Sequence, residues 1–276
     1  MNEKKDRSLI LEITDKFMAD TCMSHAAALS FYVLLSIVPL IFVLFSIGSY
    51  IAGSTNRFFV YLVDLLRQVI PDISNDVIND MHSLLGKSNA IGIIGFIILF
   101  FSSDLAVLEA KRSLDVIFKR SKKSNPLFVK GKSLLFILFS GVIVSFIFIL
   151  GPLFKFFIKL NLPILSSTFY ILAVIVSSRI FSFFLIFGLF STAYYKLPSR
   201  DIGIKYSLAA GALTTVLWTI VRVLFSWYML HHSKLSIIYG SLSAVIATII
   251  WVYYTALIFL ISAEFVAVLK DRADKR

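Results

Sequence analysis

The stretch IYGSLSAVIATIIWVYYTALIFLISAEFVAVL, residues 238–269, is apolar over about thirty residues and carries one carboxylate, Glu264, near its end. A helix of this length that is apolar on every side is longer than the roughly 20 residues needed to cross a bilayer. The segment just upstream, residues 203–230, has the same character and carries Arg222. Together the two segments predict the core of a polytopic membrane protein.

The composition extends this prediction to the whole chain. Hydrophobic residues make up 58% of the 276 positions, and the mean hydropathy is +0.88. Globular domains contain about 45–50% apolar residues, so the excess is expected to face lipid. The net charge is +11, and the basic residues cluster in short segments between apolar runs. This pattern is typical of membrane proteins, whose orientation it sets, rather than of a nucleic-acid-binding surface. The single cysteine, Cys22, excludes an intramolecular disulfide.

We predict an all-α fold with six transmembrane helices and short amphipathic interfacial helices. The predicted spans are residues 25–52, 90–109, 133–151, 166–195, 203–230 and 237–269. The second span is expected to continue as a helix into residues 111–119. Pro39 lies inside the first span and should kink it, because proline removes a helix hydrogen bond.

The remaining segments surround this single transmembrane domain, residues 25–269. Residues 1–24 form an N-terminal tail in which Leu9, Ile10, Ile13 and Phe17 share one face of a short helix, which suits the membrane surface. Apolar residues also repeat at helical spacing within 54–89, which predicts two amphipathic helices outside the membrane. A basic loop at 111–132 and a C-terminal tail at 270–276 complete the chain.

The orientation follows from the positions of lysine and arginine. Four lie in the N-terminal tail, eight in the loop 111–132, three after the fourth span and four in the C-terminal tail, against six on the opposite side. Positive charge concentrates on the cytoplasmic side of membrane proteins. Both termini are therefore expected in the cytoplasm.

Five ionisable residues within the spans are candidates for binding a substrate: Asp104, Glu109, Arg179, Arg222 and Glu264. An Arg or Asp at a helix centre costs about 2.5–3.5 kcal/mol on insertion scales, so such residues tend to be functional or paired. Asp104 and Arg179 lie at similar depth and could form either a buried tie or one wall of a polar cavity. Glu264 could reach the cytoplasmic headgroups or bond a neighbouring helix.

Arg222 follows a strip of small residues at every fourth position: Gly203, Ser207, Gly211, Thr215 and Thr219. Small residues let helices approach closely, with Gly211 as a packing position. Arg222 lies three residues beyond Thr219, so its guanidinium is predicted to point into the bundle as an anion or phosphate ligand. A carboxylate from the outer segment, such as Asp64 or Asp72, is the competing explanation. Gly240 is assigned to the turn that opens the last span, as a packing or kink position.

The chain carries no recognisable catalytic motif. The four histidines do not form a metal pattern, and neither an HExxH zinc motif nor a GxSxG nucleophile elbow occurs. We therefore expect no enzyme activity, no metal and no cofactor, although a reactive cluster of Asp104, Glu109 and a histidine would indicate a membrane enzyme.

Several motifs, taken in order, resemble the YihY / virulence factor BrkB family. They are HAAALSFYVLLSIVPL at 25–40, YYKLP at 194–198, GALTTVLW at 211–218, IYGSLS at 238–243 and SAEF at 262–265. The similarity covers about residues 20–270. It departs at SLDVIF, residues 113–118, where the family tends to have asparagine at the position of Asp115.

The resemblance implies a bacterial inner-membrane protein of six helices, for which roles in envelope lipid handling have been suggested. Some members were once labelled ribonuclease BN, but this sequence has no nuclease constellation. The expected function is a transporter or lipid-translocating protein for an anionic amphiphile, with membrane lipids as partners. The alternative is a scaffold for envelope proteins, and an intramembrane enzyme is third.

Overall fold

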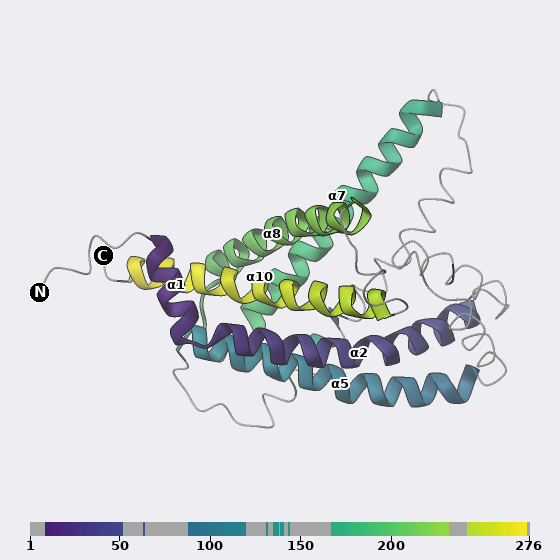
Figure 1. Ribbon diagram of the computed structural model, residues 1–276, viewed down its shortest axis with the longest axis horizontal. Helices are drawn as coiled ribbons and strands as arrows, with labels where there is room; N and C mark the ends of the chain where they lie inside the picture. The colour runs from purple at the N-terminus through teal and green to yellow at the C-terminus, as the bar shows by residue number, and fades with distance from the viewer. Residues whose placement is uncertain are drawn as a thin grey trace, which may run out of the picture. The chain divides into compact units, whose positions relative to one another are not determined.

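The computed structural model describes residues 9–51, 63, 88–119, 131, 135–137, 139–140, 143, 167–231 and 242–274. Regular structure in these residues is helical throughout. The helices are α1 (Leu9–Ala19), α2 (Cys22–Ile51), α5 (Ser88–Ile117), α7 (Ser167–Lys196), α8 (Ile204–His231) and α10 (Ser243–Ala273), shown in Figure 1. The long helices arise from the apolar runs that the sequence predicts to be spans.

The helix positions can be compared with five of the six predicted spans. Helices α2, α5, α7, α8 and α10 overlap them, and α5 continues to Ile117 as expected. Helix α10 runs past Leu269 to Ala273. Most of the predicted third span, the predicted outer helices at 54–89, and Gly240 lie outside the described residues.

Two described helices are long and apolar enough to cross a membrane, at Ile204–Met229 and Val245–Ala273. A third candidate arises if α1 and the first part of α2, which bend at residues 20–21, form one span. The described part of the chain is thus helical with two or three candidate membrane spans, and the number six stays a prediction.

The chain divides into two compact units. Unit 1 contains residues 1–22, 110–220 and 258–276, and unit 2 contains residues 23–109 and 221–257. In unit 2, the rings of Phe225 and Trp251 lie 5.2 Å apart. Also in unit 2, α2 runs as a helix through Pro39, which is buried.

Unit 1 has a core around Tyr194, which is fully buried. Its ring stacks on Phe259 with centroids 4.7 Å apart, and its hydroxyl donates to the Phe259 carbonyl at 2.6 Å. The same hydroxyl lies 2.7 Å from the hydroxyl of Thr214. Tyr194 therefore joins α7 to both α8 and α10.

Helices α7 and α8 touch at Gly211. A Cβ at this position would lie 2.8 Å from the backbone nitrogen of Ser191 and 2.9 Å from its Cα. Contacts that short do not occur, so the approach of the two backbones depends on glycine. The predicted packing role of Gly211 has this contact as its physical basis.

Helix α1 is amphipathic, and of the four residues expected on its apolar face only Ile10 is exposed. Phe17 is buried, and Leu9 and Ile13 are half-buried. On the same helix, Glu12 and Lys16 form ion pairs with the end of α10. Ile10 therefore lies on the exposed side of α1.

Candidate functional site

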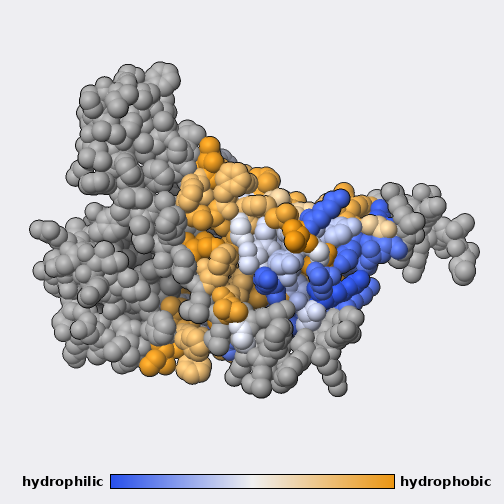
Figure 2. Space-filling model, turned by 180° about the vertical axis from the view of Figure 1, so that it is seen from behind, coloured by the Kyte–Doolittle hydropathy of each residue, from blue (hydrophilic) through white to orange (hydrophobic). Residues whose placement is uncertain are grey.

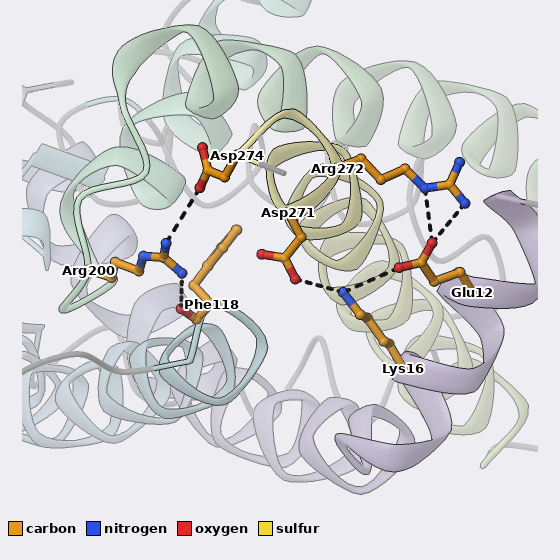
Figure 3. A network of polar contacts seen from close by, with 7 residues as sticks. All are labelled: Glu12, Lys16, Phe118, Arg200, Asp271, Arg272 and Asp274. Atoms are coloured by element: carbon orange, nitrogen blue, oxygen red, sulfur yellow. Dashed lines mark hydrogen bonds and ion pairs between the residues drawn. The ribbon is translucent and has the colours of Figure 1, made fainter. Parts of the chain in front are cut away.

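Ion pairs connect α1 to the end of α10 within unit 1 (Figure 3). The Arg272 guanidinium donates two hydrogen bonds to Glu12 Oε2, at 3.0 Å from Nε and 2.8 Å from Nη2. Lys16 Nζ donates to Asp271 Oδ2 at 2.9 Å. These pairs join residues from opposite ends of the sequence.

Arg200 adds two further segments to this arrangement. Its Nη1 donates to the carbonyl oxygen of Phe118 at 3.4 Å, and its Nη2 lies 3.8 Å from Asp274. We call the seven residues of Figure 3 the terminal network: Glu12, Lys16, Phe118, Arg200, Asp271, Arg272 and Asp274. It joins the N-terminal tail, the end of α5, the segment after α7 and the end of α10.

A second polar cluster lies where α5 meets the segment after α7. Asp115 accepts hydrogen bonds from the Ser199 backbone nitrogen at 2.6 Å and the Ser199 hydroxyl at 2.8 Å. Lys111 Nζ pairs with Asp115 at 2.6 Å, and both side chains are nearly buried. Asp115 is the position at which the sequence departs from the expected asparagine, and its charge is matched here by Lys111.

Three cations and an apolar floor form a small pocket in unit 1. We define the basic pocket by its lining residues, which are Ile117, Phe118, Lys119, Arg200, Ala267, Lys270 and Asp271. Ile117, Phe118 and Ala267 are buried beneath it. Asp271 is the one carboxylate in the lining, and Lys16 pairs with it.

Lys119 follows the end of α5 in a left-handed conformation, with φ of 50°. Its backbone nitrogen donates to the Val116 carbonyl at 3.2 Å, and the nitrogen of Phe118 donates to Leu114 at 2.9 Å. This position normally favours glycine, because Cβ is crowded there. By sequence, Lys119, Arg200 and Lys270 count among the cations that orient the chain, and the loop that holds Lys119 is also expected to attract anionic headgroups. Their shared placement next to helix ends was the available signal for a common site.

Glu264 is fully buried in unit 1. The Cys22 thiol donates to its Oε1 at 3.6 Å, and within the described part of the chain its Oε2 meets no hydrogen-bond donor. Asp20 and Lys16 lie close enough to interact with it electrostatically. Of the two expected arrangements, the bond to a neighbouring helix is therefore the one observed.

Glu109 pairs with a histidine in unit 2. Its Oε1 lies 2.9 Å from His25 Nδ1, and its side chain is 9% exposed. Asp104 is half-exposed on the same helix. The side chain of Arg179 lies outside the described residues, so the expected pairing of Asp104 with Arg179 stays a prediction.

Arg222 is exposed on α8, rather than directed into the bundle as its sequence position suggested. It is also engaged in an interaction of its own. The small-residue strip is buried at Ser207, Gly211 and Thr215 but only half-buried at Thr219. The physical reason is that α7 contacts the strip near Gly211 and Thr214, seven or more residues before Arg222.

The surface of unit 1 changes from apolar to polar along its helices. Exposed apolar side chains include Phe184, Leu208 and Ile220. Figure 2 shows such orange surface giving way to blue hydrophilic surface on one face. In unit 1, Lys196 Nζ lies 4.8 Å from the ring centroid of Tyr195, and Lys270 Nζ lies 5.8 Å from that of Tyr206. Tyrosine and lysine are typical of the membrane–water interface.

The part of the chain that the structure describes contains no recognisable set of metal ligands. No group of three or more histidine, cysteine, aspartate or glutamate side chains comes together there. The closest approach to the reactive cluster considered above is the pair of His25 and Glu109.

Comparison with known proteins identifies the family. A membrane protein of the UPF0761 group from Aliivibrio salmonicida is 26% identical over 281 residues, covering 96% of this chain and 84% of the relative. Another UPF0761 membrane protein, from Haemophilus influenzae, is 24% identical and covers 94% of each chain. A Bacillus subtilis relative, which bears the name ribonuclease-like protein YfkH, is 23% identical and covers 96% of each chain.

No solved structure matches the chain. The family model described as virulence factor BrkB matches residues 13–276, nearly the whole sequence. The relatives named as UPF0761 membrane proteins agree with the apolar helices of the fold. The chain is therefore a membrane protein that belongs to the virulence factor BrkB family.

Proposed function

We propose that the chain crosses the bacterial inner membrane six times, with both termini in the cytoplasm. The terminal network supports this topology. It joins four segments that the charge count assigns to one side: the N-terminal tail, the end of α5, the segment after α7 and the end of α10. Segments that share hydrogen bonds lie on the same side of a membrane, which requires an even number of crossings between them.

The topology can be tested with cysteines introduced at the two ends, Asn2→Cys and Lys275→Cys. The one native cysteine, Cys22, is buried, so it gives little background. In intact spheroplasts, we expect neither variant to react with a membrane-impermeant maleimide, and both to react after permeabilisation. Labelling of one end alone in intact spheroplasts would contradict the six-span proposal.

We further propose that the protein transports or translocates an anionic amphiphile, such as an envelope phospholipid. The observation that carries this proposal is that unit 1 combines exposed apolar helix surface with two lysine–tyrosine pairs, Lys196 with Tyr195 and Lys270 with Tyr206. Such a combination suits contact with both acyl chains and phosphate groups, since lysine near a membrane surface attracts anionic lipid by about 1 kcal/mol.

The functional test is translocation by purified protein in proteoliposomes that contain fluorescent phosphatidylglycerol. We expect protein-dependent exposure of inner-leaflet lipid to a membrane-impermeant quencher, which protein-free vesicles lack. Equal quenching in both preparations would refute translocation. Among the candidate residues, Arg222 is examined by Arg222→Gln; unchanged lipid movement would remove it from the mechanism.

A scaffold function is the second candidate, and the paired charges favour it. Glu109 and Glu264 bond His25 and Cys22, so these two carboxylates act as internal ties in their respective units. A scaffold would leave lipid distribution unchanged in proteoliposomes and would co-purify with other envelope proteins after cross-linking in cells.

A further inference from the structure

The basic pocket holds more positive charge than its surroundings neutralise. Lys119 is exposed, and its side chain has no partner among the described residues. Arg200 makes one long hydrogen bond and one distant ion pair, with an aspartate that is itself 57% exposed. Lys270 donates to the carbonyl oxygen of Asp201 at 3.1 Å, a contact that leaves its charge uncompensated.

The arrangement suits a phosphate group. A guanidinium presents planar paired donors that match phosphate oxygens, and an ammonium group adds a compact point charge. Here one arginine and two lysines come from three separate segments: the end of α5, the segment after α7, and α10. The carboxylate that could compete for them, Asp271, is held by Lys16 at 2.9 Å.

The backbone at Lys119 supports the assignment of a ligand role. A lysine in the left-handed region is less favourable than glycine there, because its Cβ approaches the neighbouring carbonyl. Unfavourable backbone conformations of this kind concentrate at ligand-binding positions. In this conformation Lys119 lines the pocket, at a point where a helix commonly ends in glycine.

We infer that the basic pocket binds the phosphate of an anionic phospholipid headgroup, held by Lys119, Arg200 and Lys270. A lipid fits better than a soluble phosphate for two reasons. The floor of the pocket is apolar, through Ile117, Phe118 and Ala267. Lys270 also lies over the ring of Tyr206, within the tyrosine and lysine residues that mark the headgroup level.

The central test is native mass spectrometry of the detergent-purified protein with added phosphatidylglycerol or phosphatidylcholine. The informative variant is Lys119→Gly, which removes the charge and relieves the backbone. We expect a raised melting temperature and about fivefold weaker phosphatidylglycerol binding, because one lysine contributes about 1 kcal/mol near a lipid headgroup. Arg200→Lys, which keeps the charge and loses the planar donors, should also weaken binding.

Lys205→Gln is the matched control. Lys205 is exposed on α8 and lies outside the pocket lining, so the variant loses the same charge elsewhere in unit 1. We expect this control to bind phosphatidylglycerol within about twofold of the parent protein. Equal losses of phosphatidylglycerol affinity in Lys119→Gly and Lys205→Gln would mean that the lipid is attracted by positive charge in general. That result would overturn the proposed site.

Two further outcomes bear on the identity of the ligand. Equal binding of phosphatidylcholine and phosphatidylglycerol would overturn the preference for an anion. Glycerol 3-phosphate added alone should leave the melting temperature unchanged; stabilisation as large as that from phosphatidylglycerol would overturn the lipid source.

This inference rests on the proposed function only in taking a membrane lipid as the ligand. Binding and translocation are separate measurements, so their failures can be told apart. Lys119-dependent binding without lipid movement would retain the pocket and reject the transporter. Lipid movement that is unchanged in Lys119→Gly, together with unchanged binding, would retain the transporter and reject the pocket.

Discussion

The two parts of α8 differ in whether their polar side chains are buried. In the part that belongs to unit 1, Ser207, Thr214 and Thr215 are buried and their hydroxyls donate to carbonyl oxygens one turn earlier. In the later part, which belongs to unit 2, Arg222 is exposed and so are the apolar residues around it. A polar residue in a membrane helix is therefore a packing element where another helix covers it, and a surface residue where none does.

The largest predicted effect concerns a buried charge in unit 1. Asp115→Ala should lower the free energy of unfolding by about 3 kcal/mol, because Lys111 would remain nearly buried without its anion. Thermal unfolding in detergent measures the loss. Asp115→Asn is the matched control, since its amide oxygen can still accept from Ser199, and it should lose less. Equal stability of the alanine variant and the parent would show that this pair adds nothing to unit 1.

The second effect probes the approach of α7 and α8. Gly211→Ala should cost about 2 kcal/mol, because the new methyl group would overlap the backbone of Ser191 and force the helices apart. Gly188→Ala on α7 is the control: nothing lies within 4 Å of its Cβ, and alanine favours helix. Chemical denaturation of both variants measures the difference. If both variants unfold at the same denaturant concentration, the close contact between α7 and α8 does not limit the stability of the protein.

The sequence was sufficient to locate the long helices, because apolar runs of 20 or more residues dominate local structure in a membrane protein. Helices α7 and α8 begin and end within one residue of the predicted ranges, and α2 does so within three. The continuation of α5 to Ile117 was also predictable, since no proline or glycine interrupts residues 97–119.

The partners of the polar residues could not be predicted in the same way. Cys22 and Glu264 bond across 242 residues of sequence, and no local pattern links them. The prediction that Arg222 points into the bundle was wrong for a related reason. Residues at every fourth position advance by about 40° around a helix, so a strip of small residues winds away from its partner. Which part of the strip is covered depends on another helix, here α7.

A smaller effect should follow from the loss of one buried hydroxyl. Tyr194→Phe removes the hydrogen bonds to Phe259 and Thr214 but keeps the stacked ring, so we expect a loss of about 1 kcal/mol. Tyr195→Phe is the neighbouring control. Tyr195 is 40% exposed, and the variant should match the parent in thermal unfolding. A larger loss of stability in Tyr195→Phe than in Tyr194→Phe would mean that the Tyr194 hydroxyl does not stabilise the core of unit 1.

The smallest effect is expected at Arg222, where the comparison of the two parts of α8 can fail most directly. Arg222→Gln should change the free energy of unfolding by no more than about 0.5 kcal/mol, as is usual for exposed positions. Thr215→Val on the buried part of the same helix is the contrast, because it removes a fully buried hydroxyl that bonds Gly211. A loss at Arg222 that exceeds the loss at Thr215 would mean that the guanidinium is a structural tie. Polar side chains would then stabilise both parts of α8. The exposure of a side chain would no longer predict which part of the helix depends on it.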